Sequence, residues 1–92
     1  MAISMTGDIP GMTQQQYEGA LKDVMPKMKA ARGFIAHTGA PIPGGWQVHE
    51  IWESQEAWEK FYREAIMPLM VGVPVVQQQV NTIRPLHTVL TR

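Results

Sequence analysis

The chain has 92 residues, enough for one small domain spanning 1–92, and 45% of them are apolar, including three Trp and seven Met. Eight basic and eight acidic residues cancel, and no cluster of Lys or Arg stands out, which argues against nucleic-acid binding. Because Cys is absent, disulfides, thiol nucleophiles and thiolate metal sites are excluded. The longest uncharged stretch contains two prolines and several glutamines, so we expect no membrane segment. The first residues do not resemble a signal peptide, and we expect a cytoplasmic protein.

The first third of the chain predicts a strand followed by an amphipathic helix. Residues Ala2–Ile9 alternate loosely between apolar and polar side chains, as in a strand. Thr13 is the expected N-cap of the helix, and Gln16 completes a capping box. Apolar residues then recur at steps of three and four, which forms one helix stripe: Tyr17, Leu21, Val24, Met25 and Met28. Pro26 is expected to kink or end this helix, with 27–32 as a short extra turn.

Two further strands are expected next, joined as a hairpin. Phe34–Gly39 is a short segment bounded by glycines, and the proline- and glycine-rich residues 40–45 predict a loop. Trp46–Glu53 is the clearest strand, because it is aromatic, β-branched and alternating. Its alternation places Glu50 between two tryptophans on one face and His49 on the other.

The rest of the chain predicts a second helix and a last strand. Ser54 caps the helix, and Pro68 with Gly72 is expected to end it. Residues 71–76 are expected to form a connecting loop. Gln78–Leu90 carries the last strand, and because Pro85 interrupts it, this strand is expected at a sheet edge.

The predicted element order is β-α-β-β-α-β, which indicates an α+β, ferredoxin-like domain with a four-stranded antiparallel sheet. Right-handed crossovers place both helices on one sheet face and leave the other face open. With so many apolar side chains in so small a chain, we expect a homodimer formed through the open sheet face.

Several short segments resemble a known group of proteins. They are Ile9-Pro10-Gly11-Met12-Thr13, Gly33-Phe34-Ile35-Ala36-His37, Gly44-Gly45-Trp46 and Ile51-Trp52-Glu53-Ser54, the last followed by Ala57-Trp58. Together they resemble the dimeric α/β-barrel superfamily of the antibiotic-biosynthesis-monooxygenase (ABM) type over nearly the whole chain. The resemblance implies the dimeric α/β-barrel fold and a pocket between sheet and helices. Its members include cofactor-free monooxygenases, haem-degrading enzymes, isomerases and cyclases, so the fold does not fix the reaction.

The candidate catalytic residues are His37, Glu50 and His49. His37 lies in an otherwise apolar or small run and could act as an acid or base near neutral pH. Glu50 shares its face with two tryptophans, where a carboxylate is costly to bury unless paired. It is therefore either a general base or the partner of an arginine such as Arg84. His49 could assist, and each histidine could equally be a buried structural residue.

The candidate substrate-binding residues are Trp46, Trp52, Tyr17, Asn81 and Arg84. The tryptophans and Tyr17 would form the wall of an aromatic pocket, or simply fill the core. Arg84 would bind an anionic substrate group or make a dimer salt bridge.

These residues lead to three functional hypotheses. The first is a small-molecule enzyme on a hydrophobic, aromatic or polyketide-like substrate, without organic cofactor or metal, performing oxygenation or proton transfer. The second is a non-catalytic dimeric ligand-binding or structural module with a packed interior, which predicts that His37 and Glu50 have internal partners and that no ligand-sized cavity exists. The third is haem binding.

Overall fold

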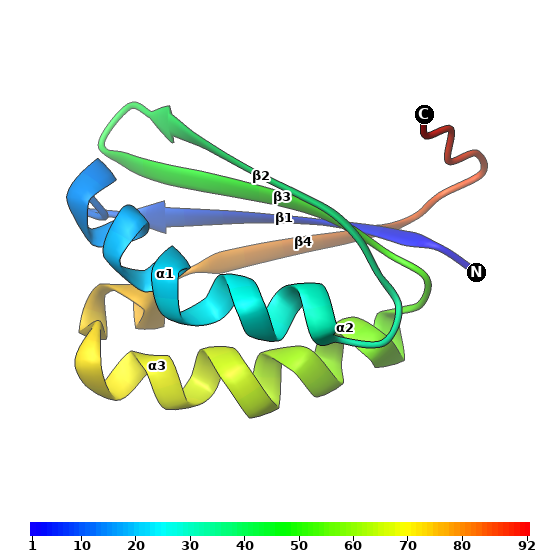
Figure 1. Cartoon of the computed structure of the whole chain (residues 1–92). Helices are drawn as coiled ribbons and strands as arrows, with labels where there is room; N and C mark the ends of the chain where they lie inside the picture. Colours follow the sequence, from blue (N-terminus) through cyan, green and yellow to red (C-terminus); the bar gives the residue numbers. More distant parts are fainter.

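The computed structural model describes all 92 residues and contains one four-stranded antiparallel sheet. The strands are β1 (Ile3–Pro10), β2 (Phe34–Ile42), β3 (Gly45–Trp52) and β4 (Val80–Pro85), in the spatial order β2-β3-β1-β4. All helices lie on one side of this sheet (Figure 1). The predicted ferredoxin-like α+β fold is confirmed, and β4 lies at a sheet edge as expected from Pro85.

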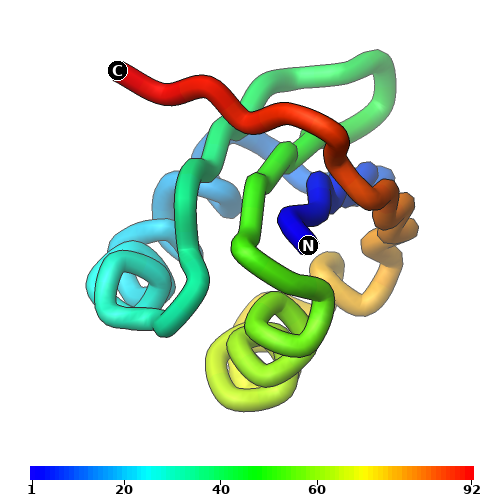
Figure 2. The backbone as a smooth tube through the Cα atoms, turned by 90° about the vertical axis from the view of Figure 1, so that its right-hand side faces the viewer, coloured from blue at the N-terminus to red at the C-terminus, as the bar shows by residue number.

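Two helical rods cover the sheet and lie side by side in the view along them (Figure 2). The first is α1 (Gln14–Ala30), which begins with the predicted Thr13 capping box. The second combines α2 (Gln55–Phe61), a π-helical segment η1 (Tyr62–Ile66) and α3 (Met67–Gly72), and the Ser54 cap begins it as predicted. A 3₁₀ helix, η2 (Pro74–Gln78), then leads to β4 in place of the predicted loop. No helix is long and apolar enough to cross a bilayer.

Neither helix proline ends its helix, although the second rod does end at Gly72 as predicted. Pro26 lies inside α1, which continues to Ala30, because Val24 and Met28 on either side of it are buried in the core. Pro68 does not end the second rod. Its missing amide cannot bond to the carbonyl four residues earlier, and its ring would clash there. The rod widens at η1 just before it, where the Met67 amide bonds to the carbonyl of Tyr62 five residues back.

Two strand boundaries also differ from expectation. β2 runs on to Ile42, and only Pro43 and Gly44 form the hairpin turn, with Gly44 at φ +75°. A proline followed by a glycine at positive φ suits a tight type II turn, so no six-residue loop is needed. β4 stops at Pro85, well before the predicted Leu90, because Pro85 pairs with Ile3, the first residue of β1, and no strand residue remains to pair beyond it.

The two sheet faces differ in character. The helix face carries the buried apolar side chains of β1 and β3, including Met5, Trp46 and Trp52, which pack against α1 and α2. The open face is largely polar and makes its own cross-strand contacts, with the Thr6 hydroxyl 3.0 Å from His49 Nδ1. This face therefore offers few apolar side chains to a partner, Ile51 of β3 among them.

Candidate active site

A β-bulge at the start of β2 places His37 on the helix face. Phe34 also faces the helices, because its ring packs edge-on against Trp52 with 5.4 Å between centroids. Residues three apart in a regular strand lie on opposite faces. The register shift between Phe34 and Ala36 adds the residue that brings His37 to the same face, directly opposite Glu50 on β3.

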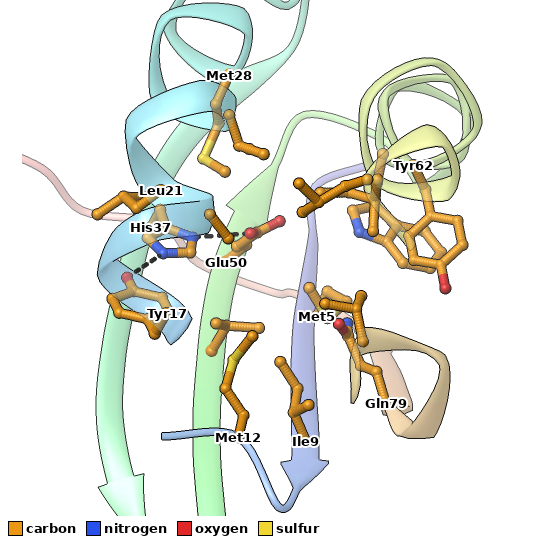
Figure 3. A pocket seen from close by; sticks show the side chains of 17 residues that line it. Met5, Ile9, Met12, Tyr17, Leu21, Met28, His37, Glu50, Tyr62 and Gln79 are labelled. Atoms are coloured by element: carbon orange, nitrogen blue, oxygen red, sulfur yellow. Dashed lines mark hydrogen bonds and ion pairs between the residues drawn. The ribbon is translucent and has the colours of Figure 1, made fainter. Parts of the chain in front are cut away.

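Three side chains from α1, β2 and β3 form a hydrogen-bonded chain (Figure 3). The Tyr17 hydroxyl lies 2.7 Å from His37 Nε2, and His37 Nδ1 lies 2.7 Å from Glu50 Oε2. The other carboxylate oxygen of Glu50 accepts a hydrogen bond of 2.9 Å from the Trp52 indole N–H. The His37–Glu50 contact is the only pairing of a basic with an acidic side chain in the protein.

The positions of the protons follow from these partners. An ionised carboxylate can only accept, so His37 Nδ1 carries a hydrogen and donates it to Glu50. In the neutral imidazole, Nε2 is then an acceptor, and the Tyr17 hydroxyl donates to it. The order is hydroxyl, imidazole and carboxylate, as in the serine-hydrolase triad, with a phenol in the place of the serine.

Burial sets the electrostatics of this chain. Glu50 is 4% exposed, yet both of its carboxylate oxygens are hydrogen-bonded, which offsets the cost of burying the charge. Burial, and secondarily the negative charge of Glu50, raises the pKa of the Tyr17 phenol above its ordinary value of 10.0. The phenol is therefore neutral at physiological pH and holds a transferable proton.

Gly39 and Trp46 fix the position of the Tyr17 ring. The ring stacks on Trp46 with 4.9 Å between centroids, and its hydroxyl rests directly on Gly39, where a Cβ would overlap it. Trp46 Nε1 is buried without a hydrogen-bond partner, 3.0 Å from the same Cβ position. Trp46 therefore acts on the site by supporting Tyr17.

A small apolar cavity lies beside the hydrogen-bonded chain, between the sheet and the two helical rods. Its volume is about 60 Å³, and fourteen of its seventeen lining residues are hydrophobic. Small-molecule sites usually measure roughly 300–1,000 Å³, so this cavity holds a few atoms and no bulky ligand. Tyr17, His37 and Glu50 provide most of its polar wall. Trp58, Tyr62 and Ile66 also line the cavity, and the apolar stripe of the second helix could have suggested them as pocket residues. Met12 lines it as well, although it precedes α1 and belongs to no helical stripe.

The remaining candidates do not join this group. His49 and Arg84 lie on the open sheet face, so neither reaches Glu50, and the alternative Glu50–Arg84 pair is excluded. Trp52 is fully buried and contacts the site only through its bond to Glu50. Asn81 does not line the cavity itself. It accepts a hydrogen bond from Gln79, which does line the cavity.

The site offers poor support for a metal or haem. No three side chains of the metal-binding types lie close enough together to hold an ion. Both ring nitrogens of His37 are already engaged in hydrogen bonds, which leaves none free for an axial haem bond. The adjoining cavity of about 60 Å³ is also far too small for a porphyrin.

Comparison of sequences alone finds nothing: no protein-family model and no curated protein matches the chain. Solved structures do match. SnoaB, a cofactor-independent oxygenase from Streptomyces nogalater, superposes with a TM-score of 0.70 at 9% identity, covering 99% of this chain and 97% of SnoaB. A protein from Chloroflexus aurantiacus that is proposed to be an antibiotic biosynthesis monooxygenase gives 0.66 at 14% identity, covering 96% of each chain. The chain has the ABM-type fold.

The ABM-type fold does not by itself assign an activity. A protein of unknown function from Nitrosomonas europaea matches with a higher TM-score of 0.76 at 11% identity, covering 99% of this chain and 94% of its own. At these identities the shared property is the fold, and the chemistry must be argued from the side chains. The resemblance inferred from the sequence motifs is thus confirmed at the level of the ABM-type fold.

Proposed function

We propose that the chain is an enzyme that removes a proton from a small hydrophobic, aromatic or polyketide-like substrate without an organic cofactor. The observation that carries the proposal is the Tyr17–His37–Glu50 hydrogen-bonded chain at the wall of an apolar cavity. Burying such a group costs stability relative to apolar side chains of similar volume, so simple packing accounts for it poorly.

The geometry suits transfer of a proton toward His37. A substrate hydroxyl or enol donates to the Tyr17 oxygen while Tyr17 passes its own proton to His37 Nε2. The imidazolium that forms is stabilised by Glu50, 2.7 Å from Nδ1. The substrate becomes an anion, and Tyr17 is neutral again after the transfer. General acid–base groups of this kind contribute roughly 10²- to 10⁴-fold to a rate.

Three reactions can follow from such an anion. Its carbon takes up a proton, which gives isomerisation, or attacks a carbonyl carbon of the same substrate, whose oxygen takes up the proton, which gives cyclisation. In oxygenation the carbon forms a C–O bond with dioxygen, and the resulting hydroperoxide loses water to leave a ketone. The fold shared with SnoaB, a cofactor-independent oxygenase, supports oxygenation by analogy of fold. The apolar cavity is large enough for dioxygen, which supports the same choice.

A non-catalytic structural module with a packed interior is the second candidate, and two observations favour it. His37 and Glu50 are satisfied by internal partners, and the cavity of about 60 Å³ is not ligand-sized. Under this hypothesis the hydrogen-bonded chain only fixes the position of α1 on the sheet.

An exchange experiment separates the two candidates. A panel of naphthols and cyclic 1,3-diketones is incubated with the protein in deuterated buffer, with proton exchange followed by NMR and oxygen uptake by an electrode. We expect acceleration by the wild type and a loss of roughly 10²-fold or more in His37→Gln and Glu50→Gln. His49→Gln, on the opposite face of the sheet, is the matched control and should keep full activity. Equal rates in all four proteins would reject the enzyme and favour the module.

We also propose that two copies pair through the open sheet face. The face is uncovered in the single chain and carries polar side chains, among them Thr6, His49 and Arg84. These side chains suit a hydrogen-bonded interface better than a hydrophobic one.

A further inference from the structure

A groove on the outer side of α1 shares a wall with the inner cavity. It lies between α1 and the edge strand β2 and has a volume of about 300 Å³. Tyr17, His37, Leu21 and Met28 line both spaces, and Figure 3 shows the first three together beside α1. The Tyr17–His37 hydrogen bond therefore forms the partition between the groove and the cavity.

The groove has the room that the cavity lacks. At about 300 Å³ it reaches the lower end of the range roughly 300–1,000 Å³ that small-molecule sites occupy, whereas the cavity of about 60 Å³ does not. A ligand in the groove would contact Tyr17 and His37 directly. Glu50 lines only the inner side, so the ligand would meet the reacting end of the hydrogen-bonded chain and not its buried carboxylate.

The lining of the groove indicates an apolar ligand. Leu21, Met25, Met28 and Phe34 supply its side walls, and methionine side chains adapt readily to the shape of a ligand. Met25 is 42% exposed although it lies on the apolar stripe of α1, so a hydrophobic surface is left open to solvent at this point. An exposed apolar surface of this kind, beside hydrogen-bonding groups, is typical of a binding site.

Lys29 is the only lysine, arginine or acidic residue that lines the groove. It has no acidic partner within ion-pairing distance, so its ammonium group is free to bind an anion. Tyr17 and Lys29 lie twelve residues apart along α1, which corresponds to about 18 Å of helix. The polar groups thus mark the two ends of an elongated apolar groove.

We propose that this groove is the substrate site and that the substrate is an elongated apolar acid. Its anionic group binds Lys29, its apolar body lies along Met25 and Phe34, and its acidic hydroxyl or enol reaches Tyr17. The assignment of the reacting end rests on the proposed function, whereas the binding of an apolar anion does not.

Two fluorescent probes of the same skeleton test the groove: 1-anilinonaphthalene-8-sulfonate, which is anionic, and N-phenyl-1-naphthylamine, which is uncharged. Both probes should bind the wild type, and added salt should lower the affinity of the anionic probe only. Lys29→Met should weaken the anionic probe by about threefold, as expected for a solvent-exposed ion pair, and leave the uncharged probe unchanged. Lys22→Met, which removes an exposed lysine of α1 outside the groove, is the control and should alter neither.

Two filling variants decide between the groove and the cavity. Met25→Trp narrows the groove alone and should weaken both probes by about tenfold, which is 1.4 kcal/mol. Ala20→Leu fills the cavity alone, because Ala20 does not line the groove, and should leave both affinities unchanged. Near-ultraviolet circular dichroism identifies variants that remain folded.

The proposal is overturned if neither probe binds, if Ala20→Leu rather than Met25→Trp removes binding, or if Lys29→Met affects both probes equally. These binding results are independent of the deuterium-exchange result. If the probes bind in the groove but the protein accelerates no proton exchange, the proposed enzymatic function is rejected and the groove remains a binding site.

Discussion

Gly39 is the residue on which the Tyr17–His37 contact depends most directly. A methyl group at this position would overlap the Tyr17 hydroxyl and approach Trp46 Nε1 to 3.0 Å. We expect Gly39→Ala to push the hydroxyl away from His37 Nε2 and to lower proton exchange to the level of Tyr17→Phe. Nitrogen NMR of the His37 ring reports whether Nε2 still accepts a hydrogen bond. A variant that keeps this bond and full activity would show that Gly39 has no such role.

Tyr17 also gives a prediction for the pH dependence of stability. Its pKa is raised in the folded chain, mainly by burial and then by Glu50, and lies near 10.0 when the chain is unfolded. Above pH 10.0 the unfolded chain has begun to lose the phenol proton that the folded chain still holds. Because the folded state then binds more protons, the free energy of unfolding falls as the pH rises toward the folded pKa.

Urea denaturation between about pH 9 and pH 11 measures this fall. Tyr17→Phe should reduce its slope, because the substituted side chain cannot ionise. Tyr62→Phe, which removes the other phenol, is the matched comparison. If Tyr17→Phe and the wild type lose stability in parallel, the shift at Tyr17 is absent.

The candidate site was only partly predictable at the level of single residues. Alternation in β3 correctly placed Glu50 with the two tryptophans and His49 on the opposite face. The pairing of His37 with Glu50 depends on the bulge after Phe34, and a one-residue change in register moves a side chain to the other face. No local pattern marks that bulge, so the sequence offered His37 and Glu50 as separate candidates.

At the level of elements, the β2–β3 hairpin depends on Gly44. Its φ of +75° strains any residue with a Cβ, although no atom lies within 4 Å of the position where that Cβ would stand. Gly44→Ala should therefore cost about 1–2 kcal/mol from backbone conformation alone. Gly19→Ala, inside α1 and also without neighbours within 4 Å, should stabilise by about 0.5–1 kcal/mol. Urea denaturation measures both, and equal effects in the two variants would contradict this argument.

Helix starts were more predictable than helix interiors. The caps at Thr13 and Ser54 are local interactions between a side chain and the next few amides, so a short motif specifies them. The effects of Pro26 and Pro68 depend on how strongly the core holds the residues around them. Tertiary packing keeps α1 continuous and allows the second rod to widen at η1, and neither result follows from local propensity.

At the level of the whole molecule, the proposed homodimer predicts twice the mass of the chain in light scattering at micromolar concentration. Ile51 and His49 both lie on the open face of the sheet, in the central strand β3. Ile51→Arg should therefore favour the monomer, because it adds a charge to the interface. Val71→Arg, at an exposed position at the end of α3, is the matched charge control and should leave the mass unchanged. A monomer mass for the wild type would refute the dimer.

The methionines around the cavity have a chemical consequence. Met5, Met12 and Met28 are buried there, beside the place where an activated substrate would meet dioxygen. Their thioethers are readily oxidised to sulfoxides, which are polar and disrupt an apolar core. An oxygenase with this lining would therefore oxidise its own core during turnover. Sulfoxides would form at the buried Met5, Met12 and Met28 before they form at the solvent-exposed Met1 and Met67.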